Sequence, residues 1–289
     1  INIWLMSYIL KSSNIMPKFG IGTWRMGENE NKSSVEINAV YYALKNGVRL
    51  IDTAEMYGEG GAEIIVGEAL KKANIKREEL FIVSKVYPHN AGRYNLFTSL
   101  KKSLSRLGLD YLDMYLLHWR GRVPLRETVE CMEEAKKEGL IKDWGVSNFD
   151  IDDMKELESI KNGDKCSVNQ VLYHLASRGV DFDLASYMLE RNIVLMAYCP
   201  LAQAGNLGND ILNNSVIKNI AKKHNATSSQ IALAFIMYFD KRVPIPKSSS
   251  EKHILENINS QNIILDKEDI ELLNKEFPKP NRKMPLDIV

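Results

Sequence analysis

The chain repeats one pattern eight times: a short apolar run followed by a charged segment with helical periodicity. The apolar runs begin near residues 19, 48, 80, 111, 142, 166, 193 and 243, and most intervals match the roughly 30 residues of one strand and helix unit. Alternating strands and helices predict a parallel sheet, and eight units predict closure into a (β/α)8 TIM barrel. The alternative, an open doubly wound sheet, is disfavoured because no GxGxxG fingerprint follows the first run.

Further elements surround this barrel. Residues 8–10 and 14–16 predict an N-terminal hairpin, and the long interval after residue 193 has room for two extra helices, at 216–224 and 227–239. Three helix starts carry the pattern of a capping box, in which a hydroxyl and a carboxylate or amide three residues apart satisfy each other's backbone N–H groups. These pairs are Ser33 with Glu36, Thr227 with Gln230, and Ser248 with Glu251. Since no linker or change of composition interrupts the pattern, we expect one domain over residues 1–289.

Composition restricts the partners and the location. The formal net charge of +1 gives no basic surface for nucleic acid or an anionic membrane. Three widely spaced cysteines, Cys131, Cys166 and Cys199, argue against a disulfide framework or a metal site and are typical of a cytoplasmic protein. The longest apolar run, residues 231–239, is shorter than the roughly 18 residues a membrane span needs. The apolar amino end lacks a signal-peptide pattern, and one interpretation is that translation begins at Met6, with residues 1–5 upstream of it.

Polar side chains stand at or just after the ends of three consecutive strands. Asp52 and Tyr57 follow the second, Lys85 ends the third and His118 ends the fourth. Adjacent parallel strands lie about 4.8 Å apart, so these four side chains can meet at the carboxyl face of the barrel. Each has a structural alternative: Asp52 as the cap of a turn, Lys85 as a snorkelling side chain, and Tyr57 and His118 as core residues. Their occurrence together on neighbouring strands favours a catalytic site.

This set suits general acid catalysis by a phenol. A free tyrosine has a pKa of about 10, which makes it a poor proton donor at neutral pH unless its anion is stabilised. We expect the Lys85 ammonium to lower the pKa of Tyr57, and Asp52 to keep Lys85 charged and in place. His118, as a neutral imidazole, can donate a hydrogen bond to a carbonyl oxygen and orient it.

Several motifs in the chain resemble those of the aldo-keto reductases. They are GVRLIDTAEMYG from residue 47, VSKV around Lys85, LLHW around His118, GVSNF from residue 145, and IPKS from residue 245 with EN at 256–257. In order, they cover nearly the whole chain. The resemblance implies a TIM barrel that reduces aldehydes or ketones with NAD(P)H and without metal. The segments HWRGRVPL and PNRKMPLDIV look most like bacterial and archaeal reductases of small aldehydes such as methylglyoxal.

The resemblance also implies roles for individual residues. Tyr57 would be the proton donor, with Asp52, Lys85 and His118 around it, and Trp24 and Trp119 would form the substrate pocket. The cofactor-binding positions would be Thr23, Trp24, Ser147, Asn148, Gln170, Tyr198, Leu201, Lys247, Ser248, His253, Glu256 and Asn257. Among them, Ser147, Asn148 and Gln170 would hold the nicotinamide carboxamide and Tyr198 would stack on its ring. From the residues alone, Ser147 and Asn148 are equally well explained as helix caps, and Tyr198 as a core aromatic.

The adenosine end of the proposed cofactor site departs from the family pattern. Lys247 and Ser248 match positions that meet the 2′-phosphate, at a helix start whose dipole favours an anion, and Glu256 and Asn257 match the adenine contacts. His253 stands where NADPH-preferring members carry arginine, and histidine is only partly charged at neutral pH. We therefore expect NADPH as the cofactor, with NADH possible. Cys199 stands where serine is common beside the pyrophosphate, which makes that contact weaker.

Two functions from other classes remain open from the sequence. One is a regulatory module of the same fold that binds nicotinamide and a protein partner. The other is a barrel lyase or isomerase that uses Lys85 as a Schiff-base lysine. The resemblance further implies a small-molecule carbonyl substrate and favours a monomer. We expect loops 119–125 and 202–214 and the tail after Pro278 to shape the substrate pocket.

Overall fold

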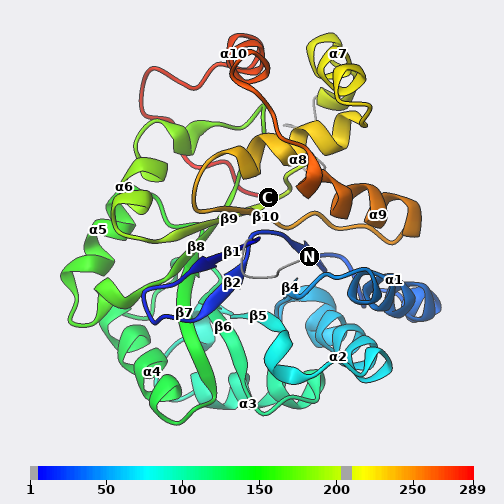
Figure 1. Cartoon of the computed structure of the whole chain (residues 1–289). Helices are drawn as coiled ribbons and strands as arrows, with labels where there is room; N and C mark the ends of the chain where they lie inside the picture. Colours follow the sequence, from blue (N-terminus) through cyan, green and yellow to red (C-terminus); the bar gives the residue numbers. More distant parts are fainter. Residues whose placement is uncertain (1–5, 203–209) are drawn as a thin grey trace.

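Eight parallel strands form a nearly closed barrel in the part of the chain that the structure describes, residues 6–202 and 210–289 of a computed structural model (Figure 1). Hydrogen-bonded neighbours follow the order β10-β9-β8-β7-β6-β5-β4-β3. The strands are β3 (Gly20–Gly22), β4 (Leu50–Asp52), β5 (Phe81–Val86), β6 (Leu112–Leu117), β7 (Ile141–Ser147), β8 (Val168–Leu172), β9 (Val194–Tyr198) and β10 (Arg242–Pro244). The predicted TIM barrel is confirmed. The interpretation of residues 1–5 lies outside the described ranges.

Helices surround the barrel (Figure 1). Those between successive strands are α1 (Ser33–Lys45), α2 (Gly61–Ala73), α3 (Leu96–Leu107), α4 (Leu125–Lys137), α5 (Ile151–Ser159) and α6 (Leu184–Glu190). The long interval before β10 holds α7 (Ser215–Lys223) and α8 (Ser228–Tyr238), and α9 (Glu251–Asn259) and α10 (Lys267–Glu276) follow that strand. The extra helices predicted late in the chain are therefore present.

Alternation along each strand divides the core into an inner and an outer layer. Successive side chains of a strand point to opposite faces, so every second residue enters the barrel. The inner cluster includes Leu50 of β4, Val83 of β5 and Leu116 of β6. The residue two positions after each of these is Asp52, Lys85 and His118, respectively. The period of two thus directs all three polar side chains toward the carboxyl end of the barrel interior.

The N-terminal hairpin closes the opposite end. Strands β1 (Ser7–Ile9) and β2 (Ile15–Pro17) pair antiparallel, as predicted, and Tyr8 and Met16 join the inner cluster. The hairpin turn is fixed to β7, because Asn14 donates a side-chain hydrogen bond of 2.7 Å to Asp143. A ligand therefore reaches the barrel interior from the carboxyl end of the strands.

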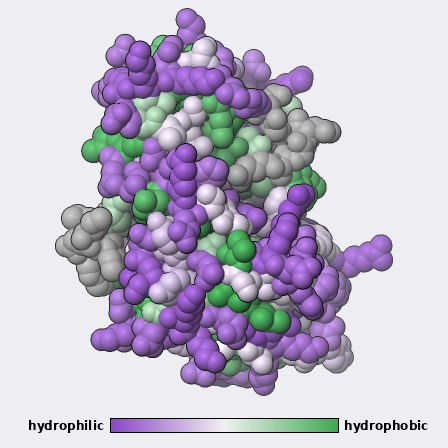
Figure 2. All heavy atoms as spheres, turned by 90° about the vertical axis from the view of Figure 1, so that its right-hand side faces the viewer, coloured by the Kyte–Doolittle hydropathy of each residue, from purple (hydrophilic) through white to green (hydrophobic). Residues whose placement is uncertain are grey.

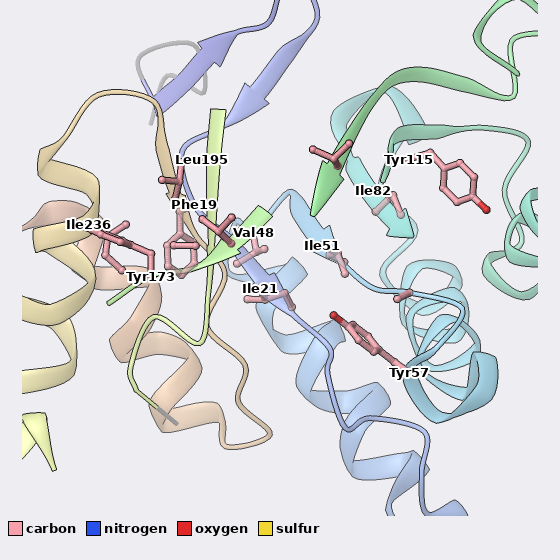
Figure 3. Packing of buried hydrophobic residues seen from close by; sticks show 14 of the residues in the cluster. Phe19, Ile21, Val48, Ile51, Tyr57, Ile82, Tyr115, Tyr173, Leu195 and Ile236 are labelled. Carbon is pink, nitrogen blue, oxygen red and sulfur yellow. The ribbon is translucent and has the colours of Figure 1, made fainter. Parts of the chain in front are cut away.

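The outer layer is a continuous apolar core between the strands and the helices. Figure 3 shows part of it, with Phe19 and Leu195 from the barrel side lying near Ile236 of α8. The hydroxyl of Tyr57 in the same view points toward the region of Ile21 and Ile51. The face of the molecule in Figure 2 is mostly hydrophilic, with apolar side chains in small separate groups. None of the helices in the described ranges has the length and apolar character that crossing a bilayer requires.

One of the three predicted capping boxes is confirmed and two are wrong. Thr227 and Gln230 satisfy each other's backbone N–H groups at the start of α8. At α1, a 3-10 turn (Glu30–Lys32) precedes the helix, so Ser33 already lies inside it, and Glu36 accepts a hydrogen bond of 2.8 Å from the Gly27 N–H instead. The third box, at Ser248, fails because α9 begins at Glu251, so that the capping residue is Ser250.

Candidate active site

The phenol of Tyr57, the ammonium of Lys85 and the carboxylate of Asp52 form a continuous chain of contacts. Lys85 Nζ donates to Asp52 Oδ2 at 2.7 Å and to Tyr57 Oη at 3.1 Å. Its third hydrogen bond, of 2.9 Å, goes to the carbonyl oxygen of Thr53. Because an ammonium has three donors, Lys85 is fully hydrogen-bonded, as a buried charge must be. The interpretations of Lys85 as a snorkelling side chain and of Asp52 as a turn cap do not fit this arrangement.

Local backbone geometry brings Tyr57 to this position. The chain turns directly after β4, where the Tyr57 N–H bonds to the Ala54 carbonyl at 3.1 Å, and continues into a short helical segment (Tyr57–Gly60). Gly58 has a φ of 57°, in the left-handed region that glycine enters without strain. A Cβ at Gly58 would also lie 2.7 Å from the Gly27 carbonyl oxygen, so a larger residue would displace the segment.

Burial dominates the proton affinities at this site. It raises the pKa of Tyr57 well above its ordinary value, with Asp52 adding to the effect. The expectation that Tyr57 has a lowered pKa is therefore wrong for the protein without ligands, because desolvation of a phenolate outweighs the neighbouring ammonium. Burial also lowers the pKa of Lys85 and raises the pKa of Asp52, in each case against the attraction of the other. Tyr57 is thus a neutral phenol at physiological pH, with its proton available for donation.

His118 lies beside Tyr57 as a neutral imidazole. The two ring centroids are 5.7 Å apart in an edge-to-face arrangement. Burial, with a smaller contribution from the charge of Lys85, holds the pKa of His118 well below its usual range. Within the described residues, its buried Nδ1 atom has no hydrogen-bond partner. The ring itself lines the pocket next to Tyr57.

The side chains predicted at the nicotinamide form a network at the ends of β7, β8 and β9. Gln170 Nε2 donates to Asp52 Oδ1 at 2.7 Å, and Ser147 Oγ donates to the Gln170 carbonyl at 2.8 Å. Tyr198 Oη donates to Asn148 Oδ1 at 2.8 Å. The alternative that Ser147 and Asn148 cap the following helix is wrong, because the cap of α5 is Asp150, which is engaged in a capping box of its own.

At the start of α9, the predicted phosphate-binding residues are spread along one segment. Lys247 and Ser248 are half-buried, and the Ser248 hydroxyl accepts a hydrogen bond of 3.1 Å from the Ser250 N–H. His253 is exposed in the first turn of the helix, where its N–H bonds to the Ser250 hydroxyl. Farther along, Glu256 is half-buried and Asn257 is buried. Lys247 and Ser248 line the same pocket as Tyr57. His253, Glu256 and Asn257 lie beyond it.

A pocket of about 330 Å³ connects the two groups of residues. It is lined by Gly22, Trp24, Arg25, Asp52, Met56, Tyr57, His118, Trp119, Ser147, Asn148, Gln170, Tyr198, Cys199, Pro200, Ile245, Lys247, Ser248 and Val289. Of the other predicted residues, Thr23 is buried below it and donates to the Asp52 carbonyl at 3.0 Å, and Leu201 is buried next to Pro200. The pocket thus runs from the buried phenol to a lysine at a helix start.

A family comparison decides what kind of protein this is. The model of the Aldo/keto reductase family matches residues 18–276. The chain belongs to the aldo/keto reductase family.

Individual aldo/keto reductases align with nearly all of the chain. Methylglyoxal reductase YeaE of Escherichia coli (strain K12) is 44% identical over 274 residues, 95% of each sequence. Glyoxal reductase of Bacillus subtilis (strain 168) is 39% identical over 266 residues, 90% of each. The crystal structure of an aldo/keto reductase from Klebsiella pneumoniae in complex with NADP and acetate matches with a TM-score of 0.94 and 43% identity, over 98% of this chain and 99% of that one. The predictions of an oxidoreductase and of the small-aldehyde branch are therefore confirmed.

Sequence reasoning did not identify several residues that line this reductase pocket: Gly22, Arg25, Met56, Pro200, Ile245 and Val289. Two of them had a usable signal, since Gly22 ends β3 and Ile245 directly follows β10, the same strand-end position that identified Asp52. Val289 fits the expectation that the tail after Pro278 shapes the pocket. The corresponding expectation for loop 202–214 falls largely on residues 203–209, outside the described ranges.

Proposed function

We propose that this aldo/keto reductase reduces small aldehydes and ketones, including dicarbonyls of the methylglyoxal type, with NADPH, and that Tyr57 supplies the proton. The observation that carries this proposal is the 3.1 Å contact between the Tyr57 hydroxyl and the Lys85 ammonium at the floor of the pocket. The methylglyoxal and glyoxal reductases similar to this chain support the substrate class.

In this proposal, Tyr57 is the general acid. As its proton moves to the carbonyl oxygen of the substrate, negative charge develops on the phenol oxygen. The Lys85 ammonium stabilises that charge more strongly than it interacts with the neutral phenol, and this difference lowers the barrier. Asp52 holds Lys85 in its charged form. The neutral imidazole of His118 lines the pocket beside Tyr57, and as an N–H donor it can orient the substrate oxygen.

The residues along the pocket fit a nicotinamide dinucleotide. Ser147, Asn148 and Gln170 present amide and hydroxyl groups suited to a carboxamide, and the Tyr198 ring lies beside them at the wall. Lys247 and Ser248 offer a cation and a hydroxyl to a phosphate near the start of α9. When bound, NADPH supplies the hydride. The NADP complex of the Klebsiella pneumoniae protein supports this choice, and an exposed histidine at position 253 is consistent with some use of NADH.

The pocket walls support a small substrate. Trp24, Met56 and Trp119 contribute apolar surface to its lining, and His118 and Trp119 lie with ring centroids 5.0 Å apart. We also propose a cytoplasmic location, which the odd number and wide spacing of the cysteines support, and a monomeric state that light scattering would test.

The alternative of a Schiff-base lyase has less support. A lysine nucleophile needs a free amine lone pair, whereas the Lys85 ammonium donates to three oxygen atoms. A lyase using Lys85 would be trapped by borohydride in the presence of substrate, and a reductase would not.

The proposal is tested by initial rates of NADPH oxidation with methylglyoxal and a panel of aldehydes, for the original protein and for Tyr57→Phe. Loss of the general acid should lower kcat by about 100- to 10,000-fold. NADPH binding, measured by fluorescence titration, should be retained. A variant that keeps its turnover would refute the role of Tyr57. An original protein that binds NADPH without oxidising it in the presence of any aldehyde would favour the regulatory module.

A further inference from the structure

Glu55 is a buried carboxylate next to the proposed general acid that has no role in the mechanism above. It lies between Asp52 and Tyr57 in the sequence, and only 8% of the residue is exposed. The Tyr87 N–H donates to Glu55 Oε1 at 2.7 Å, and Asn90 Nδ2 donates to the same oxygen at 3.2 Å. Both donors are uncharged. Burying a carboxylate costs free energy unless it is hydrogen-bonded. A neutral side chain at this position would carry a smaller desolvation cost.

These two hydrogen bonds join the loop after β4 to the loop after β5. Tyr87 and Asn90 follow the strand that carries Lys85, whereas Glu55 lies inside the turn from Ala54 to Tyr57. The main chain reinforces the connection, because the Glu55 N–H lies 3.4 Å from the carbonyl oxygen of Lys85. The proposed acid and its neighbouring ammonium thus reside on two segments that the Glu55 carboxylate connects.

We propose that Glu55 is a positioning residue that keeps the Tyr57 hydroxyl within hydrogen-bonding distance of Lys85. This inference rests on the proposed function, in which that contact stabilises the developing phenolate. Hydrogen bonds to a carboxylate are about twice as strong as those between neutral groups, which suits Glu55 to fixing a short turn. A displacement of the reacting group by 1 Å lowers enzymatic rates by on the order of 100-fold, so a small loosening of the turn has a measurable effect.

The test compares Glu55→Ala with Glu55→Gln. Both hydrogen bonds end on Oε1, so glutamine keeps the acceptor oxygen and alanine removes it. Glu55→Ala should lower kcat by about 10- to 100-fold, and Glu55→Gln should restore most of it. The solvent deuterium isotope effect on kcat should increase in Glu55→Ala, since a misplaced acid slows proton transfer relative to the other steps. Glu55→Gln should leave this isotope effect nearly unchanged.

Glu59 provides the matched control. It lies on the same loop, is exposed, and accepts a hydrogen bond of 3.1 Å from the Tyr87 hydroxyl. Glu59→Ala should keep both the rate and the solvent isotope effect. Asn90→Ala is a second test, because it removes one donor to Glu55 without changing the turn, and it should raise the solvent isotope effect by a smaller amount.

A crystal structure of Glu55→Ala gives a readout that is independent of turnover. The distance between Tyr57 Oη and Lys85 Nζ should exceed the present 3.1 Å. An unchanged distance overturns the inference, as does a lower kcat with an unchanged solvent isotope effect, which would indicate a loss of folded protein only. An equal increase of the isotope effect in Glu59→Ala also overturns it. If the original protein oxidises no NADPH with aldehydes, the proposed function fails, and the crystallographic distance still decides the positioning role.

Discussion

Replacing Lys85 by methionine should separate the two roles of this side chain, in stability and in catalysis. Lys85 is completely buried, and its ammonium lies 2.7 Å from Asp52, which is 2% exposed. Removing one member of a buried pair leaves the other charge uncompensated and costs about 3–5 kcal/mol. Gln170 would remain as a side-chain donor to Asp52. At roughly 2 °C per kcal/mol for a chain of this size, the melting temperature should fall by about 6–10 °C.

The double variant Asp52→Asn with Lys85→Met distinguishes the two roles. Asparagine removes the uncompensated charge, so stability should return to within about 2 kcal/mol of the original protein. In both Lys85→Met and the double variant, kcat should be lower than in the original protein by a factor of about 100 or more, because no ammonium faces Tyr57. Urea denaturation followed by fluorescence and circular dichroism measures the free energy of unfolding, and initial rates with saturating NADPH measure the turnover. Recovery of turnover in the double variant, or full turnover in Lys85→Met, would refute the reasoning.

Three further predictions follow from other parts of the molecule. His253→Arg should strengthen NADPH binding by about tenfold, the value of one charged hydrogen bond, and leave NADH binding little changed; an equal effect on both cofactors in fluorescence titrations would contradict the assignment. Burial lowers the pKa of His174 to about 4. Below about pH 6.5 the unfolded chain therefore takes up a proton that the folded protein does not bind. The free energy of unfolding should fall as the pH is lowered from about 6.5 to about 4. His174→Asn should reduce the slope of stability against pH in this window by up to about 1.4 kcal/mol per pH unit, and an unchanged slope in denaturation curves would contradict it. The proposed single domain over residues 1–289 predicts one calorimetric unfolding transition, with equal calorimetric and van't Hoff enthalpies; two resolved transitions would argue for separate units.

The barrel and the polar side chains at its strand ends were predictable from the sequence for a simple reason. Side chains along a strand alternate between its two faces, so a polar residue that ends an apolar run points either into the barrel or toward the helices. It points to the same face as the apolar residue two positions before it. Asp52, Lys85 and His118 are inward positions by this rule. Tyr57 was singled out because it follows the same strand as Asp52, but the direction of its side chain depends on the turn after β4, which the period of a strand does not predict.

Other features depend on tertiary structure and left no clear sequence signal. Arg25 lines the pocket from a backbone with a φ of 63°, which the sequence of a loop does not specify. The failed capping boxes at Ser33 and Ser248 arise because a helix start shifted by one or two residues changes the capping residue. The pKa of Tyr57 was misjudged because the cost of burying a phenolate depends on how completely the surrounding chain excludes water.

The contact between the first and last strands of the barrel, β3 and β10, restricts which residue can occupy position 22. Gly22 donates its N–H to the Pro246 carbonyl at 3.1 Å across this contact, and a Cβ at Gly22 would lie 2.9 Å from the Ile245 carbonyl oxygen. Any side chain at position 22 would therefore force the two edges of the sheet apart at the wall of the pocket, which Gly22, Ile245 and Lys247 line. Natural variants and laboratory libraries should tolerate substitutions in the loops at the carboxyl end of the strands far more readily than at Gly22.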